Sequence, residues 1–361
     1  MLLQKIFQSF LFLILVLHNI DCDSCKEDGE FKISCSSYSD LLTYKNPGRL
    51  KSAKVSILET FETENGVKEL FMCDESTFQH YSALKYLDMT KSRVVYLSAN
   101  CFKGLDNLES IKISDNELSE IDMNTFRVSE KMQIRNIDLI NNKILDIDLQ
   151  SVNLPDLTSL KVTNNSLTSF YLKSENVPKI VNLDLAQNYI WRFTIESLTL
   201  TYLDLSFNCI KAFNKGHLAL PSLKRLHLEG NHLSLINEGM FENMPKLQYV
   251  HLNHNLLHTV SLSNLNLVFI DINYNQIKTL DRVNLKFRQH SSLHLNFNKV
   301  FEMMTTTEFG NLTELICNFC NIHTIELYFV DKISSNLESL SLRSNLLTSA
   351  NFSKQDKKVL I

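Results

Sequence analysis

The segment LKRLHLEGNHL, residues 223–233, contains the pattern that decides the fold. Apolar residues stand at its positions 1, 4, 6 and 11, and an asparagine stands at position 9. The segment LTYLDLSFNCI, residues 200–210, shows the same pattern one unit earlier. Positions 4 and 6 alternate with positions 3, 5 and 7 as the two faces of a β-strand do. The pattern therefore predicts one short strand per unit, with one buried face.

The same unit recurs along most of the chain. A search for internal periodicity finds twelve copies, three of them with one substitution, such as Ser92 or Cys320 at the asparagine position. The copies begin at Leu84, Leu108, Ile134, Leu157, Ile180, Leu200, Leu223, Leu247, Leu267, His290, Leu312 and Leu337. Residues 67–77 are interpreted as a degenerate thirteenth unit. Since no unit can bury its apolar face alone, neighbouring units are expected to stack into one continuous core.

The consensus and its period, about 23 residues per unit, are typical of leucine-rich repeats. The predicted fold is an α/β solenoid, a horseshoe with a parallel β-sheet on its concave face and mostly irregular or short helical convex segments. The shortest units, Asn188–Asn208 and Asn255–Asn275, leave too few residues for a convex helix. The stretch Ile144–Leu157 is predicted to have room for a helical turn. The asparagine column is interpreted as structural, because its amides can satisfy backbone groups where each strand ends.

The chain is predicted to divide into four parts. Residues 1–21 read as a signal peptide, because the apolar run is too short to cross a bilayer. Residues 22–66 form a cysteine-containing cap, residues 67–350 form the solenoid, and residues 351–361 form a short tail. We therefore expect a soluble, secreted, extracellular protein with no membrane anchor.

Secretion favours disulfides among the cysteines. The candidates near the N-terminus are Cys22, Cys25, Cys35, Cys73 and Cys101. Their pairing stays open. Cys317 and Cys320 occupy an inward position and the asparagine position of one unit, an interpretation that we prefer to a redox motif.

Composition and motifs exclude several functions. The formal net charge is −4, which argues against nucleic-acid binding, and only 8 glycines leave little room for phosphate-binding loops. None of the common nucleotide-binding, hydrolase or zinc-protease motifs occurs in the sequence. We predict that the protein is not an enzyme and that it uses no cofactor and no metal.

The concave face carries the candidate binding site. Between residues 200 and 300, positions 3, 5 and 8 are rich in aromatic residues and histidines, which would supply contact area and pH-responsive polar contacts. The predicted ligand-binding residues are Tyr202, Phe207, Arg225, His227, Tyr249, His251, His254, Phe269, Asp271, Tyr274, His294 and Phe297. Alternatively, the rings merely stack on one another along the ladder. A metal site at His227 and His251 with Asp271 or His294 is the weaker alternative.

Three sequons, at Asn164, Asn311 and Asn351, predict N-glycosylation in a secreted protein. A glycan on Asn164, beside the concave edge, would hinder binding at the unit that begins at Leu157. It would leave the units between residues 200 and 300 accessible.

The signal segment, the N-terminal cysteines and the two quoted repeats resemble the extracellular leucine-rich-repeat superfamily over residues 67–350. The alternation of short and long repeats is most similar to the secreted leucine-rich immune proteins of insects. That resemblance implies innate immune recognition or the scaffolding of an immune partner by protein–protein interaction, with a complement-like thioester protein as one such partner. Adhesion proteins and Toll-type receptor ectodomains share the repeat and supply the alternative function. The coiled coil and the C-terminal cysteine cap of the longer immune proteins are missing.

The expected partner is therefore a protein or a microbial surface ligand. Only fourteen residues follow Leu347, and a solenoid end without a cap would expose apolar side chains. Either the chain is a truncated form, or this end forms a homo-oligomer or hetero-oligomer.

Overall fold

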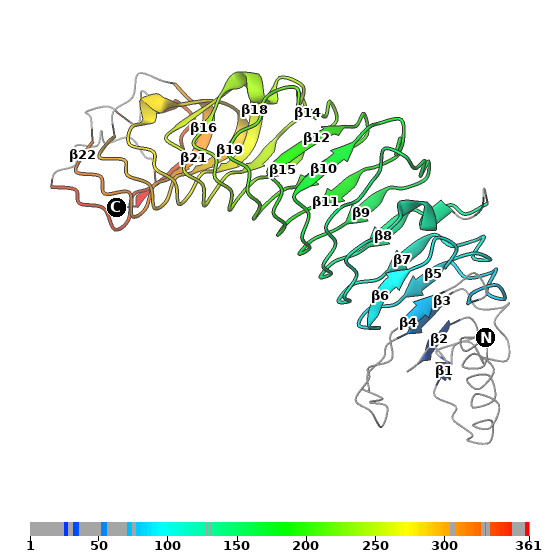
Figure 1. Ribbon diagram of the computed structural model, residues 1–361. Helices are drawn as coiled ribbons and strands as arrows, with labels where there is room; N and C mark the ends of the chain where they lie inside the picture. Colours follow the sequence, from blue (N-terminus) through cyan, green and yellow to red (C-terminus); the bar gives the residue numbers. More distant parts are fainter. Residues whose placement is uncertain are drawn as a thin grey trace.

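The chain forms a curved solenoid (Figure 1). The computed structural model describes residues 77–127, 129, 131–303, 308–325, 329 and 333–348, and the strand segments 25–27, 32–35, 52–55, 71–73 and 358–360. The predicted signal peptide, Cys22 and Asn351 lie outside the described residues.

Each of the twelve predicted units contributes one strand to a single parallel sheet, at its positions 3 to 5, which confirms the predicted fold. The pairing is in register, so that Leu203 lies opposite Leu226, and Leu226 opposite Val250. The strands are β5 (Tyr86–Asp88), β7 (Ser110–Lys112), β8 (Asn136–Asp138), β9 (Ser159–Lys161), β11 (Asn182–Asp184), β13 (Tyr202–Asp204), β15 (Arg225–His227), β17 (Tyr249–His251), β23 (Ser339–Ser341) and the C-terminal parts of β18 (Thr259–Asp271), β19 (Val283–His294) and β21 (Gly310–Ile316).

The sheet continues beyond the twelve units at both ends. Strands β2 (Lys32–Cys35) and β3 (Ser52–Val55), from the segment interpreted as a cap, pair with each other, and β3 pairs with β5. Strand β1 (Cys25–Glu27) lies antiparallel to β2. At the other end, β24 (Lys358–Leu360) pairs with β23, so the predicted tail adds a strand.

The interpretation of residues 67–77 as a thirteenth unit of this ladder is wrong. Strand β4 (Phe71–Cys73) pairs with β6 (Val94–Leu97) in a separate two-stranded sheet. The position before β5 in the parallel ladder is occupied by β3, so Phe71–Cys73 lies outside that ladder.

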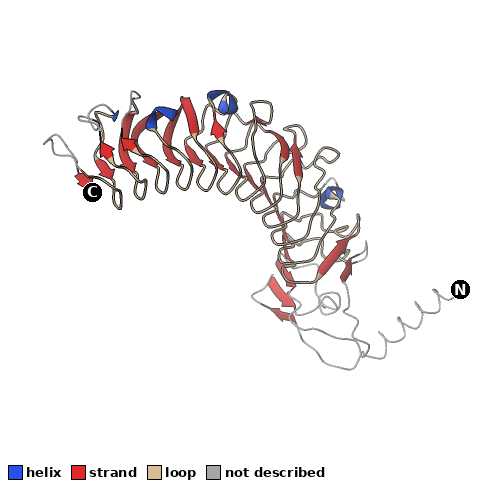
Figure 2. Cartoon of the chain, turned by 60° about the vertical axis from the view of Figure 1, so that its left-hand side comes forward, coloured by secondary structure: helices blue, strands red, loops and turns tan. Residues whose placement is uncertain are grey.

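The convex segments are mostly extended (Figure 2). Strands β10 (Ser169–Leu172), β12 (Arg192–Glu196) and β14 (Leu218–Ala219) form a second parallel sheet. Shorter pairings join β16 (Leu235–Ile236) to the start of β18, and β20 (Glu302–Met303) to β22 (Thr324–Ile325). Among the described residues, the helical segments of three or more residues are the 3-10 turns η2 (Met123–Arg127), η3 (Glu238–Phe241) and η4 (Leu280–Arg282). No described helix is long and apolar enough to cross a bilayer.

Two expectations about the convex side have different outcomes. The shortest units are extended there, as predicted, and Asn188–Asn208 carries β12. The helical turn predicted within Ile144–Leu157 is wrong. Buried and exposed residues alternate through most of that stretch, as extended backbone requires, and Asp148 accepts hydrogen bonds from the backbone N–H groups of Gln150 and Ser151, which favours a turn.

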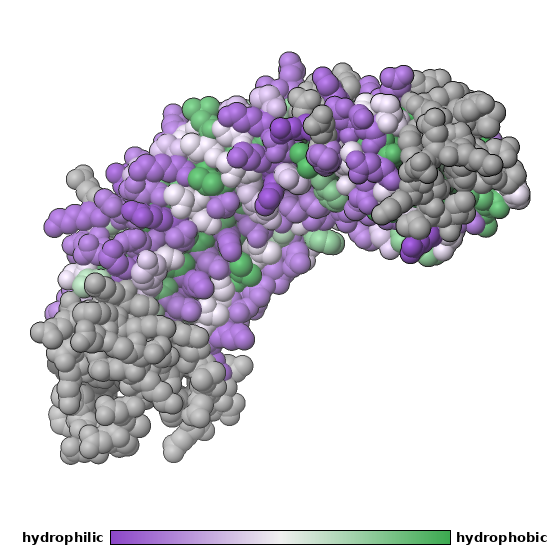
Figure 3. Space-filling model, turned by 180° about the vertical axis from the view of Figure 1, so that it is seen from behind, coloured by the Kyte–Doolittle hydropathy of each residue, from purple (hydrophilic) through white to green (hydrophobic). Residues whose placement is uncertain are grey.

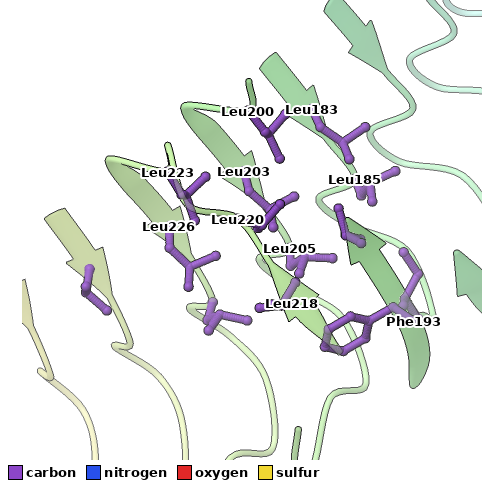
Figure 4. Packing of buried hydrophobic residues seen from close by; sticks show 14 of the residues in the cluster. Leu183, Leu185, Phe193, Leu200, Leu203, Leu205, Leu218, Leu220, Leu223 and Leu226 are labelled. Carbon is purple, nitrogen blue, oxygen red and sulfur yellow. The ribbon is translucent and has the colours of Figure 1, made fainter. Parts of the chain in front are cut away.

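The inward leucines of neighbouring units meet in one core (Figure 4). Leu203 and Leu205 of one unit and Leu226 of the next are fully buried. The cluster runs without interruption from Ala53 to Leu342. Truncating one such leucine to alanine typically costs about 2–5 kcal/mol, so the spine is the main source of stability.

The buried asparagines join each unit to the preceding one. Asn208 accepts a hydrogen bond from the backbone N–H of Ile190 through Oδ1, at 2.9 Å. Its Nδ2 donates to the carbonyl oxygens of Leu185 at 3.0 Å and Leu205 at 3.1 Å. One amide therefore satisfies backbone groups of two units.

The cysteines are only partly paired in the described residues. Cys317 and Cys320 form a disulfide, which the analysis of the repeat positions did not anticipate. Cys101 is disulfide-bonded, as predicted. The β1–β2 register places Cys25 opposite Cys35. The side chains of these two cysteines and of Cys73 lie outside the described ones.

Substituting Asn208 with alanine tests the structural role of the column. We expect a loss of about 2–4 kcal/mol, because buried backbone groups on both units lose their partners. Urea unfolding followed by the fluorescence of Trp191, which adjoins Ile190, measures the loss. The exposed Asn107, which donates one hydrogen bond to the Ser82 carbonyl, is the control, and Asn107→Ala should cost less than about 1 kcal/mol. Equal losses would contradict the assigned role.

Candidate functional site

Five rings along the concave sheet form one continuous stack, which we name the concave column: Tyr202, His227, His251, Phe269 and His294. Ring centroids are 5.3 Å apart between Tyr202 and His227, and 5.2 Å apart between His251 and Phe269. The two histidines His227 and His251 lie face to face, with centroids 4.3 Å apart and planes inclined by 6°. Phe269 meets His294 edge to face at 4.9 Å. The predicted residues of five neighbouring strands are thus brought together.

Arg225 and Tyr249 border the column. The Arg225 guanidinium lies over the Tyr249 ring, 5.1 Å from its centroid, which is a cation–π contact between β15 and β17. Asp271 lies between His251 and His294 in the sheet register. Its carboxylate accepts a hydrogen bond from the backbone N–H of Asn273, at 2.9 Å.

A second row of rings, which we name the edge ladder, follows the turns after the strands. It consists of His254, Tyr274, Phe297 and Phe319, whose successive centroids are 4.2, 4.3 and 4.7 Å apart with nearly parallel planes. All four are exposed, Phe319 to 50%. Phe207, one of the predicted residues, lies two units before His254 and packs over Gly230, where a Cβ atom would lie only 2.5 Å from its ring.

The backbone under the edge ladder is in the left-handed conformation, with φ between 53° and 55° at its four residues. The same position of earlier units has this conformation too and is occupied by Asp115, Asn141 and Asn164. Asparagine and aspartate tolerate φ > 0, whereas bulky side chains do so at a cost of about 1–2 kcal/mol each. The aromatic residues therefore occupy positions that local conformational preference would give to asparagine.

The aspartates at position 5 prove to be part of the turn. Asp138, Asp184, Asp204 and Asp271 each accept a hydrogen bond from the backbone N–H two residues later, at 2.9 to 3.1 Å. Asp204 also accepts the Ser206 hydroxyl at 2.6 Å and the Tyr202 hydroxyl at 3.1 Å. In later units this N–H is bound by an asparagine of the preceding unit. Asp271, predicted to bind ligand, thus has a structural role.

The column lies in an acidic environment. The Nδ1 atom of His227 is 3.2 Å from Oε1 of Glu229, whose second oxygen is buried without a partner among the described residues. Burial opposes protonation of His227, but Glu229 and the carboxylates of Asp204 and Asp184 outweigh it and raise its pKa. Burial and the neighbouring His227 lower the pKa of His251. Sequence reasoning missed Glu229, although its position 7 faces the same side as positions 3 and 5.

Burial also raises the pKa values of two neighbouring groups, Asp204 and Tyr202. Burial raises the pKa of Asp204 although Ser206 donates two hydrogen bonds to it. Burial and the adjacent Asp204 carboxylate raise the pKa of the Tyr202 hydroxyl. The surroundings therefore favour the protonated forms of Tyr202, Asp204 and His227 and disfavour protonation of His251.

The geometry argues against the metal alternative. Two parallel imidazole rings in face-to-face contact cannot direct lone pairs from both rings at one ion, because the lone pairs lie in the ring planes. No group of three or more His, Cys, Asp or Glu side chains within the described part of the chain is arranged to hold a metal ion.

The described sequon asparagines are accessible. Asn164 is exposed and donates from Nδ2 to Oδ1 of Asn141, at 2.7 Å. Asn311 is also exposed, and its Oδ1 accepts from Nδ2 of Asn336 at 3.1 Å. Glycosylation at these two residues stays a prediction.

The repeats, the sheet register and the asparagine column define a leucine-rich-repeat fold. The family profile described as leucine rich repeat matches residues 69–118, 178–233, 198–257 and 221–277. Among curated proteins, mouse fibromodulin is 30% identical over 135 residues, or 36% of this chain and 34% of fibromodulin. Human lumican is 39% identical over 92 residues, 24% of this chain and 26% of lumican. The matches thus span about a third or less of these two relatives.

Solved structures share the fold. The crystal structure of the LRIM1/APL1C complex matches with a TM-score of 0.56 and 19% identity, over 75% of this chain and 52% of that chain. The glycosylated Toll–Spatzle complex of Drosophila matches with a TM-score of 0.62 and 16% identity, over 87% and 47%. The neighbours therefore include the insect immune and Toll-type proteins that the sequence resembles.

The raised pKa of His227 predicts a pH-dependent stability. A raised folded-state pKa stabilises the fold fully below the ordinary value of 6.5, and this contribution is lost as the pH rises through the folded-state pKa. The difference in unfolding free energy between the wild type and His227→Gln should therefore decrease from about pH 5.5 to about pH 8.5. Urea titrations at each pH measure it.

His251→Gln is the matched comparison. Because the pKa of His251 is lowered, the folded state should lose its contribution as the pH falls, which is the opposite trend. Parallel pH profiles of the two variants would contradict the assigned electrostatics.

Proposed function

We propose that this chain is a secreted, non-enzymatic binding protein that holds a protein partner on the concave column and the edge ladder. The observation that carries the proposal is the edge ladder itself. Four exposed rings stand in a row on left-handed backbone, where Asn141 and Asn164 show that a less costly residue fits. Exposed aromatic rows are the usual anchors of protein interfaces.

The rings also stack on one another, so mutual stacking alone is the competing explanation. Each aromatic pair contributes about 0.5–1.5 kcal/mol beyond burial, which is close to the cost of a left-handed aromatic residue. Stacking therefore offsets the strain and adds little net stability. Because the edge ladder adds little net stability and exposes apolar area, binding of a partner explains its presence better than stacking does.

The surroundings of the ladder suit a selective interface. Over the coloured part of the face seen in Figure 3, hydrophobic residues are scattered among hydrophilic ones. The histidines of the concave column and the neighbouring carboxylates of Asp204 and Glu229 are polar groups that are half-buried. Apolar anchors with a polar surround are the arrangement that protein interfaces use.

Innate immune recognition, or the scaffolding of an immune partner, is the proposed role. The structural neighbours include a complex of LRIM1 with APL1C and a complex of Toll with Spatzle, which is described as a molecular hub in Drosophila development and innate immunity. The alternative is work as an adhesion protein or receptor ectodomain. The sequence relatives fibromodulin and lumican favour an extracellular role outside immunity.

The double variant Tyr274→Asn with Phe297→Asn tests the binding proposal. Asparagine fits the left-handed backbone, so the unfolding free energy should change by less than about 2 kcal/mol. The tagged full chain, added to the native extracellular fluid, should capture a partner whose identity is read by mass spectrometry. The double variant should lose at least about 90% of that partner, because two central anchors are gone.

Tyr189→Ala is the matched control, because Tyr189 is 60% exposed but has no ring contact among the described residues. It should capture as much partner as the wild type. Undiminished capture by the double variant, together with a clear loss of stability, would show that the ladder only stacks.

A further inference from the structure

A cluster of cations lies away from both ring rows, at the edge where the concave strands begin. Lys224, Lys246 and Arg288 line a hollow of about 340 Å³ together with Pro245 and Gln248. All three cationic side chains are exposed, and none forms an ion pair with another described residue. None of the described residues that line the hollow is acidic.

The backbone fixes two of these residues in neighbouring units. The carbonyl oxygen of Lys224 accepts the N–H groups of Gln248 and Tyr249, both at 3.0 Å, so position 2 of one unit lies beside position 2 of the next. Lys246 immediately precedes the first position of that second unit. The two ammonium groups therefore project from adjacent turns of a rigid sheet edge.

A β-bulge supplies the third cation. The pairing of β18 with β19 jumps from Leu267 opposite Phe287 to Phe269 opposite Ser292, so residues 288–291 contain extra residues. The Ser291 hydroxyl donates to the carbonyl oxygens of Arg288 and Leu267, which fixes the bulge. Bulges redirect side chains and are common beside functional sites, and this one carries Arg288 to the hollow.

Cations at the same repeat positions elsewhere are neutralised. At position 2, Glu109 forms ion pairs with Lys85 and Arg135 of the flanking units. At the position before the unit, Lys179 lies 2.7 Å from Asp156. Around the hollow, the corresponding neighbours are Thr201 and Ser222, which carry no charge. The unpaired cations are therefore a local departure in a chain whose formal net charge is −4.

We propose that this hollow binds a multiply charged oxyanion, the sulfate or phosphate group, either free or as a substituent of a sugar chain. An arginine fork and two ammonium groups supply the donors that such a group accepts, and Gln248 adds a neutral amide donor. The anion would also relieve the repulsion among the three cations. This site goes beyond the proposed protein interface, since it uses another edge and another ligand.

Calorimetry of the full chain with a heparin-derived sulfated hexasaccharide tests the site, at about 150 mM NaCl so that weak surface attraction is screened. The Kd should rise at least about tenfold in the triple variant Lys224→Gln, Lys246→Gln, Arg288→Gln, since charge-assisted hydrogen bonds are lost. Lys179→Gln, which removes a paired lysine from the same edge, should stay within about twofold of the wild type. Arg288→Lys keeps the positive charge but lacks the planar guanidinium, so its Kd should lie between those of the triple variant and Lys179→Gln.

Two further ligands identify the source of the oxyanion. Inorganic phosphate that competes with the hexasaccharide indicates a site for the free group, and a lack of competition indicates a site for the substituted sugar chain; both support the oxyanion site. Binding of the chemically desulfated hexasaccharide with equal affinity would overturn it. So would a wild type that binds no sulfated sugar, or equal losses in the triple variant and Lys179→Gln.

The fold and the protein interface are checked separately. The three side chains are exposed, so the melting temperature of the triple variant should match the wild type. Should the triple variant fail to fold, Arg288→Lys carries the test, and an affinity equal to that of the wild type would then overturn the proposal. Tyr274→Asn with Phe297→Asn should bind the hexasaccharide normally, which separates failure of this site from failure of the protein interface.

Discussion

One inward-facing asparagine amide in most units sets the geometry on which the solenoid depends. Asn116, Asn208 and Asn298 each accept a backbone N–H of the preceding unit and donate to carbonyl groups of both units. The leucine spine supplies most of the stabilising free energy, but apolar contacts are not directional. The amide fixes the register, because a shift of one residue would leave its donors and its acceptor without partners.

The turn that contains this asparagine also restricts which residues fit at the outward positions beside it. To bring the amide inward, the preceding residue takes a left-handed conformation, as Asp115 and Asn164 do. Position 5 then supplies a carboxylate to the exposed N–H of the turn, as Asp204 does. Two of the outward positions of each unit are therefore partly committed to structure. Phe297 occupies the left-handed position, which favours asparagine, and His251 occupies position 5, where other units have the aspartate that binds the turn. Residues of this kind need a functional explanation.

Sequence reasoning predicted the features that recur from unit to unit and missed those that differ between units. The strand at every unit follows from the alternation around Leu203 and Leu226, which twelve copies make unambiguous. The rings of His227 and His251 could be placed together because equal positions of parallel strands are neighbours. The helical turn near Asp148 was predicted wrongly, because the convex path depends on packing between units. The bulge that carries Arg288 leaves no trace in the consensus, since extra residues look like ordinary variation in repeat length.

The solenoid changes character near residue 200. Before it, the left-handed position holds Lys91, Asp115, Asn141, Asn164 and Gln187. Beyond it, the same position is aromatic in five of seven units, and Gly230 and Ser344 are the exceptions. Lys224 and Lys246 have no ion-pair partner among the described residues, whereas Lys179 is paired with Asp156. The left-handed conformation is the same on both sides of this boundary, so the backbone at this position does not by itself require aromatic residues. Both departures occur in the later units, and the two binding sites proposed at different edges of those units would account for both at once.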